Sequence, residues 1–201
     1  MLAEWSVECG ADDPVLVVPW SSPDTGASSG PHFVDLRQNP YDLDQIPEAE
    51  LHPPLMQALR ALNATRSPVF TAKCDAWPMD PGELAATRLN LELSAAEFPD
   101  GFVSYIDIVW RERSLFVSLP QQQQRLLRLV RLLDPLDHPG AAVEAVIRPA
   151  MVELAGRAQE GFAVSLYVKA LGTDPPHAYE HWTRALEALV LLLRGKELSL
   201  A

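Results

Sequence analysis

The most regular hydrophobic patterning lies in the C-terminal part of the chain. Val, Ile and aromatic residues dominate Gly101–Trp110, which is the composition of a β-strand. Apolar residues recur at helical spacing through Pro120–Leu133 and again through Pro175–Arg194, where Asp174 is placed to cap the helix. The pattern therefore predicts one strand and two long amphipathic helices in this region.

Residues 142–153 fit both a helix and a strand. Their apolar residues recur at helical spacing, but they also alternate, and Pro149 interrupts the run. A short internal sequence repeat favours a strand, because Gly-Phe-Val-Ser at 101–104 recurs as Gly-Phe-Ala-Val-Ser at 161–165. The second copy would then be a strand that 142–153 can pair with. We expect 142–153 to pair with 161–171, with the proline at an edge or a bulge. The region would then contain a weak internal ββα repeat.

Short apolar runs separated by turn residues characterise the Pro-rich part of the chain before residue 101. The runs predict strands at Glu4–Cys9, Val15–Trp20, His32–Arg37 and Val69–Trp77. The first two would form a hairpin, and a further strand at Leu115–Leu119 would form a second hairpin with Gly101–Trp110. Alternation along Val69–Trp77 places Thr71, Lys73 and Asp75 on one face.

Turn and cap residues define the other elements of this part. Ser21–Gly30 consists almost entirely of Ser, Gly, Asp and Pro, which is typical of a surface loop. Pro54–Ala64 has leucines at helical spacing, and Asp80 precedes a short helix as its N-cap. Together the patterns predict an α+β fold in one domain, residues 1–201. Its mostly antiparallel sheet would have seven or eight strands, with the two long helices packed on one face.

Composition fits a globular protein of a reducing compartment. The chain has 201 residues, of which 48% are hydrophobic, and its two cysteines, Cys9 and Cys74, form no CxxC pair. No apolar run reaches the length of a membrane span, and the start Met-Leu-Ala-Glu-Trp lacks the features of a signal peptide. We expect a cytoplasmic protein without a membrane partner.

The negative charge is concentrated near the start of the chain. The net charge is −11, and residues 1–54 hold ten of the 27 acidic residues but only one cation, Arg37. Nucleic acid is therefore not an expected partner, because phosphate binding requires a cationic surface. A solvated acidic face is the simplest interpretation, and an interaction surface for a basic protein is the alternative. That surface would include four residues: Asp42, Asp44, Glu48 and Glu50.

One motif has a chemical meaning. His177-Ala-Tyr-Glu-His181 spells HxxEH, which on a helix places two imidazoles on one face, as in inverted zinc metalloproteases. A catalytic zinc needs a third protein ligand, and only 20 residues follow His181. A coincidental pair is the simpler interpretation, and a metal-dependent hydrolase built on His177 and His181 is the alternative.

Charged residues inside strands form the second candidate site. Lys73, Asp75, Asp107 and Lys169 interrupt apolar runs. Charges that point to water from an open sheet face would explain them. The alternative is a polar cleft that shifts carboxylate pKa values, in which Asp107 would lie beside Tyr105 and Lys169 beside Tyr167.

The sequence contains no GxSxG, P-loop or GxGxxG pattern. We therefore expect a non-catalytic binding or assembly module without a cofactor, which self-associates as a homodimer through a sheet edge or a helix face. An acidic inhibitor of a basic protein is a third possibility. Arg125, Arg128 and Arg131 on one helix would complement the acidic segment, within one chain or between two.

Overall fold

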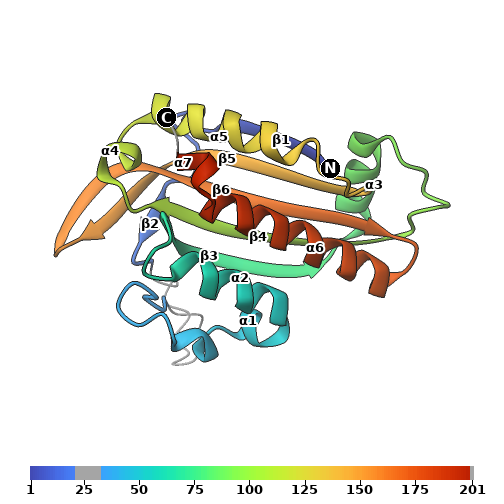
Figure 1. Cartoon of the computed structure of the whole chain (residues 1–201), viewed down its shortest axis with the longest axis horizontal. Helices are drawn as coiled ribbons and strands as arrows, with labels where there is room; N and C mark the ends of the chain where they lie inside the picture. Colours follow the sequence, from blue (N-terminus) through green and yellow to red (C-terminus); the bar gives the residue numbers. More distant parts are fainter. Residues whose placement is uncertain (21–32, 200–201) are drawn as a thin grey trace.

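The fold is an α+β arrangement of one mixed sheet and a layer of helices (Figure 1). A computed structural model describes residues 1–20 and 33–199. The predicted loop Ser21–Gly30 lies outside the described residues, as does His32. The strands are β1 (Leu2–Val7), β2 (Leu16–Val18), β3 (Val69–Pro78), β4 (Asp100–Trp110), β5 (Ala141–Leu154) and β6 (Arg157–Gly172).

Helices occupy most of the segments between the strands. They are the 3₁₀-helix η1 (Asp42–Gln45) and the α-helices α1 (Pro47–Leu51), α2 (Pro53–Asn63), α3 (Pro81–Leu91), α4 (Arg113–Phe116), α5 (Leu119–Leu133), α6 (Pro175–Arg194) and α7 (Lys196–Ser199). The predicted caps are confirmed for α3 and α6, where Asp80 and Asp174 accept hydrogen bonds from backbone N–H groups of the first turn. No helix within the described residues has the length and apolar character needed to cross a membrane.

The sheet has six strands among the described residues, so the predicted number of seven or eight is wrong. Its order is β1-β5-β6-β4-β3, and β2 also pairs with β5. Both β1 and β2 run parallel to β5, while the other neighbours are antiparallel. The predicted hairpin of β1 and β2 is therefore wrong, and residues 33–37 form no strand.

The length of β5 explains the unexpected pairing. Its first half pairs with β1 as far as Ile147, and β2 pairs from Ala150 onward. Pro149 falls between the two pairings, and because it has no N–H it cannot donate a ladder bond at this point. The prediction that 142–153 is a strand paired with 161–171 is confirmed.

The predicted strand Leu115–Leu119 is instead the helix α4 and the start of α5. The side chain of Gln122 accounts for this, because its Nε2 donates to the carbonyls of Leu115, Phe116 and Phe162. These bonds satisfy carbonyl groups at the end of a short helix and tie it to β6. The apolar residues of the run are still buried, but from a helical backbone.

One face of the sheet is covered by helices, with α6 between α2 and α5 (Figure 1). The main core lies between these helices and the sheet, and Trp182 of α6 is fully buried in it. Its Nε1 donates to Ser104 Oγ at 2.8 Å, which satisfies both polar groups in an otherwise apolar layer. Fully burying each large apolar side chain here contributes roughly 1.5–3 kcal/mol.

A bulge in β3 decides which residues of this strand face the helices. The register with β4 shifts between Thr71 and Lys73. Asn63 of α2 fixes the bulge, because its Oδ1 accepts from the Thr71 N–H at 3.0 Å and its Nδ2 donates to Thr71 Oγ1 at 2.7 Å. Thr71 and Lys73 therefore lie on opposite faces, which corrects the simple alternation expected from the sequence.

Candidate functional site

The face of the sheet opposite the main helix layer carries the predicted polar residues. Cross-strand pairing from β3 through β4 to β6 aligns them in three rows. The rows are Lys73–Asp107–Ser165, Asp75–Tyr105–Tyr167 and Trp77–Val103–Lys169. The fold thus brings Lys73, Asp75, Asp107 and Lys169 onto one face, which we call the open face.

Asp107 is the most buried charged residue of the open face. Its side chain is only 7% exposed, and Ser165 Oγ donates to its Oδ1 at 2.5 Å. Burial raises the pKa of Asp107, while the Ser165 hydrogen bond and the charges of Lys73 and Arg148 oppose the shift. A carboxyl group held in this way favours its protonated form more than a solvated aspartate does.

Arg148 of β5 links this row to the edge of the sheet. Its guanidinium forms an ion pair with Glu8 at 2.8 Å, and its Nη1 lies 3.4 Å from both Ser165 Oγ and Tyr167 Oη. Sequence reasoning did not select Arg148, Glu8 or Ser165. Strand alternation in 142–153, which the sequence predicted as a strand, places Glu144 and Arg148 on one face and could have identified both residues.

Three aromatic rings form a line across the open face. The ring centroids of Trp77 and Tyr105 are 6.2 Å apart, and those of Tyr105 and Tyr167 are 6.0 Å apart. All three side chains are half-buried, so part of each ring remains accessible. Burial and the neighbouring carboxylates raise the pKa of Tyr105, which therefore stays a neutral phenol.

Each cation of the open face already has a partner. Lys169 Nζ lies 2.9 Å from Glu144 Oε2, Arg148 is paired with Glu8, and Lys73 Nζ lies 5.4 Å from the ring centroid of Trp20. Asp75 differs, because among the described residues its carboxylate accepts a hydrogen bond only from the N–H of Ala76. No Lys or Arg side chain among the described residues forms an ion pair with it.

Structural elements close both ends of the open face. At one end α3 packs beside it, and Trp77 Nε1 donates to Glu83 Oε2 at 3.1 Å. At the other end a small second core includes Phe70, Val109 and Phe116. The polar rows therefore occupy a band between two apolar or helical boundaries.

The two histidines of the HxxEH motif lie elsewhere, on the first turns of α6. His177 Nδ1 lies 2.8 Å from Asp174 Oδ2, and His181 Nδ1 lies 2.8 Å from the carbonyl of Leu171. Among residues 1–20 and 33–199, no group of three His, Cys, Asp or Glu side chains is arranged to hold a metal ion. Both rings are therefore engaged in contacts at the start of α6.

The acidic segment forms a separate surface. Asp42 and Asp44 belong to η1, while Glu48 and Glu50 belong to α1, at the edge of the helix layer beside β3.

Burial raises the pKa of Cys74, which lies in β3, to about 12, with Glu48 adding to the shift. A thiol with this pKa is not a nucleophile at neutral pH.

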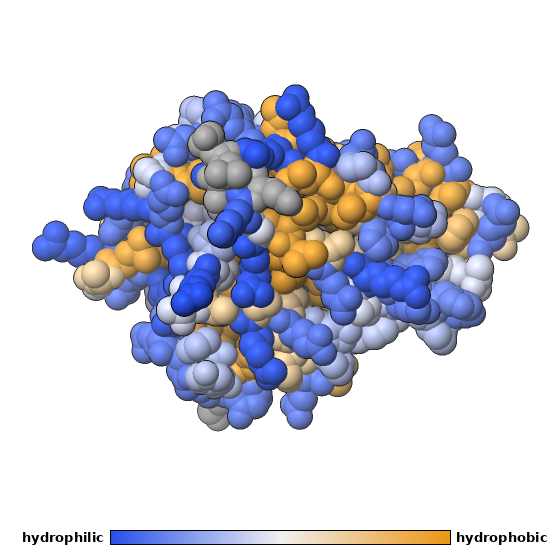
Figure 2. Space-filling view, in the orientation of Figure 1, coloured by the Kyte–Doolittle hydropathy of each residue, from blue (hydrophilic) through white to orange (hydrophobic). Residues whose placement is uncertain are grey.

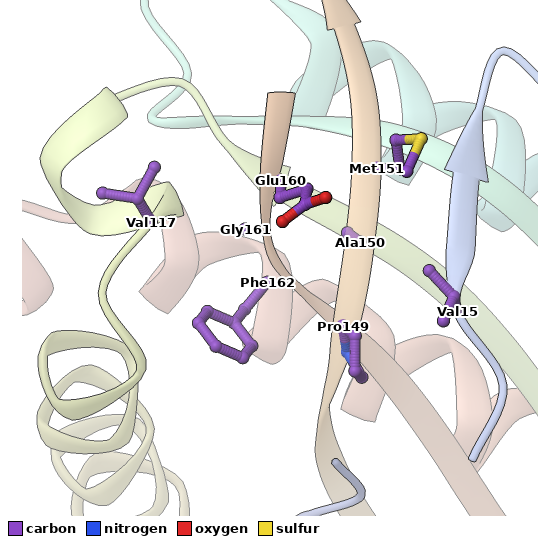
Figure 3. Close-up of a pocket in the computed structure, with 8 residues that line it drawn as sticks. All are labelled: Val15, Val117, Pro149, Ala150, Met151, Glu160, Gly161 and Phe162. Carbon is purple, nitrogen blue, oxygen red and sulfur yellow. The ribbon is translucent and has the colours of Figure 1, made fainter. Parts of the chain in front are cut away.

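A hollow of about 470 Å³ lies at the far end of the β5–β6 hairpin (Figure 3). Its lining is mainly apolar, with Val117 and Phe162 on one side and Val15 and Met151 on the other. Glu160 is the charged residue of the lining. None of the open-face residues lines this hollow.

No family model matches the chain, and no curated protein or solved structure matches it.

Proposed function

We propose that the protein is a non-catalytic binding module that holds a cationic group on the open face of its sheet. The ammonium or guanidinium of the ligand would lie against Asp75, beside the rings of Trp77 and Tyr105. The observation that carries the proposal is that Asp75 has no cationic partner among the described residues. Each cation of this face, by contrast, already has a carboxylate or an aromatic ring as its partner.

The charges of the open face support a cationic ligand. Its acidic residues outnumber its three cations, Lys73, Arg148 and Lys169. The acidic residues are Glu4, Glu8, Asp75, Asp107 and Glu144. The faces of aromatic rings also carry partial negative charge, so Trp77 and Tyr105 add attraction for a cation.

The strength of these contacts favours a ligand with several cations. A partly exposed cation–π contact contributes about 0.5–1 kcal/mol, and an exposed ion pair contributes a similar amount. A single amine would therefore bind with a Kd on the order of 1 mM or weaker. A polyamine or a Lys-rich protein segment fits the open face better, because it can reach several carboxylates at once.

Isothermal titration calorimetry of the whole chain tests the proposal with two probes, a tetra-amine and a ten-residue Lys-rich peptide. The probe that binds more tightly identifies the source of the cation. Asp75→Asn is expected to weaken binding about tenfold, which corresponds to about 1.4 kcal/mol. Glu153→Gln is the matched control, because it removes one carboxylate from an exposed residue of β5 and leaves the open face unchanged.

Equal weakening by Asp75→Asn and Glu153→Gln would contradict the proposal, since binding would then follow net charge alone. Binding of a Glu-rich peptide of equal length with the same affinity would also contradict it.

A further inference from the structure

The hollow at the end of the β5–β6 hairpin lies on the same face of the sheet as the helix layer. Two neighbouring cross-strand pairs, Pro149–Phe162 and Met151–Glu160, contribute to its lining. Strand alternation places these four residues on the face of Ile147, which is fully buried in the main core. The hairpin extends beyond α5 and α6 (Figure 1), so the same face of the sheet reaches solvent there.

Close packing of α4 on β6 fixes one wall of the hollow. A Cβ atom at Gly161 would lie 2.6 Å from the ring and from the carbonyl oxygen of Phe116, so a glycine is needed for this approach. The buried side chain of Gln122 donates to the carbonyls of Phe116 and Phe162, at 3.3 and 2.8 Å. These contacts hold Val117, at the end of α4, beside Phe162. The wall is therefore preformed, as is usual in small-molecule sites.

The apolar lining of the hollow is accessible to a ligand. Val15, Val117 and Met151 all belong to the exposed large hydrophobic residues of the protein. Figure 2 shows hydrophobic residues at the surface of the left end of the molecule, where the β5–β6 hairpin lies in Figure 1. The volume of about 470 Å³ lies within the range of small-molecule sites, roughly 300–1,000 Å³. The hollow therefore has the size and the lining for one small, mainly apolar molecule.

The charge of the lining specifies a cationic group on that molecule. Glu160 forms no ion pair with any residue of the ranges 1–20 and 33–199. In Figure 3 its carboxylate lies between Val117 and Met151, the two sides of the hollow. An apolar group that fills the hollow would exclude water and so strengthen the attraction between this carboxylate and a cation.

The side chains around Glu160 favour an aromatic group over an aliphatic one. The ring of Phe162 can stack edge to face with a second ring. The thioether of Met151 also makes favourable contacts with aromatic rings. Both residues line the hollow, so one ring can contact both.

We infer that the hollow binds a small aromatic amine, with its ring against the apolar side chains and its ammonium on Glu160. The site lies on the face of the sheet opposite Asp75, and none of its residues belongs to the open face. The inference therefore does not rest on the proposed binding function.

Isothermal titration calorimetry of the whole chain with phenethylamine tests the site. Butylamine and phenylpropionate are the comparison ligands, because the first lacks the ring and the second carries the opposite charge. We expect phenethylamine to bind about tenfold more tightly than either. Asp75→Asn should leave its affinity unchanged, which distinguishes this site from the open face.

Substitution of the carboxylate tests the contact with the ammonium. Glu160→Gln should weaken the binding of phenethylamine about tenfold. Glu153→Gln is the matched control, because Glu153 is an exposed carboxylate of the same hairpin outside the lining. It should leave the affinity unchanged.

Met151 offers a second test, because it lies directly across the strand pair from Glu160. Met151→Lys would place an ammonium of the chain itself beside the carboxylate, so the binding of phenethylamine should be lost. Met151→Leu keeps an apolar side chain and should retain most of the affinity. Met151 is exposed, so both variants should fold, and circular dichroism checks this.

The absence of measurable phenethylamine binding by the natural chain would overturn the inference. So would equal affinities for phenethylamine and butylamine, tighter binding of phenylpropionate, or equal effects of Glu160→Gln and Glu153→Gln. A concentration-dependent dimer that Met151→Lys dissociates would also overturn it, because a second copy of the chain would then cover the hollow.

Discussion

The two faces of the sheet are built from alternate residues of the same strands and differ in how their polar groups are satisfied. On the helix side, Ile106 and Ile108 of β4 are fully buried, and Ser104 needs only the Trp182 indole as its partner. On the open side, Tyr105 and Asp107 of the same strand lie among charged neighbours. The comparison shows that one strand can contribute to a dry core and to a polar surface at once.

The difference indicates that the helix side mainly determines stability and that the open side mainly determines binding. Burial on the helix side stabilises the fold, so substitutions there should lower stability without affecting a ligand. The open side contributes less burial, so substitutions there should act mainly on binding and on the dependence of stability on pH or salt.

The largest expected effect comes from a substitution in the core on the helix side of the sheet. Leu186→Ala removes a buried side chain of α6 and leaves a cavity, so we expect a loss of about 2–5 kcal/mol in the free energy of unfolding. Chemical denaturation of the variant and of Leu89→Ala measures the effect. The Leu89→Ala control should change stability by less than about 0.5 kcal/mol. Equal losses would show that α6 does not pack as described.

Asn63→Ala tests the bulge that separates the two faces of β3. The substitution leaves the Thr71 N–H without its acceptor, so we expect a loss of about 1–3 kcal/mol. Asn90→Ala on α3 is the matched control, because Asn90 is exposed. A result for Asn63→Ala no larger than that for Asn90→Ala would contradict the role given to this side chain.

Asp107→Asn should change how stability depends on pH. We expect this effect to be smaller than the loss in the free energy of unfolding caused by Leu186→Ala or Asn63→Ala. Because the pKa of Asp107 is raised in the folded protein, ionisation of this group costs stability. Relative to the variant, the natural protein should lose stability as the pH rises from about 4, the unfolded value, through the raised folded pKa. Urea unfolding from pH 3.5 to pH 8 measures the difference. A rise in the stability of the natural protein relative to the variant as the pH increases would contradict the assignment.

The smallest effect concerns the Glu144–Lys169 ion pair on the open face. Both side chains are about one-third exposed, so a double-mutant cycle with Glu144→Gln and Lys169→Met should give a coupling of about 0.2–1 kcal/mol. The coupling should decrease in 1 M salt, where exposed charges are screened. A larger, salt-independent coupling would show that the pair is effectively buried.

Local signals in the sequence were sufficient for much of the fold. Asp80 and Asp174 mark the starts of α3 and α6 because a capping carboxylate acts on backbone groups a few residues away. The polar residues of β4 and β6 could be assigned to one face because side chains alternate along a regular strand.

Contacts between distant segments could not be predicted in the same way. The parallel docking of β1 and β2 on β5 depends on residues more than a hundred positions apart. The bulge at Thr71 depends on a side chain of the preceding helix, and the helix α4 on Gln122. Arg148 and Glu8 joined the candidate site only through this long-range pairing.

Nuclear magnetic resonance of the ¹⁵N-labelled chain, titrated with the Lys-rich peptide, tests the role of the open face most directly. The account predicts that the peptide shifts the resonances of β3, β4 and β6 around Asp75, Tyr105 and Tyr167, together with the Trp77 indole. Resonances of α5 and α6 should stay unchanged. Shifts confined to the helix layer or to the acidic segment of η1 and α1, or no shifts at all, would contradict it.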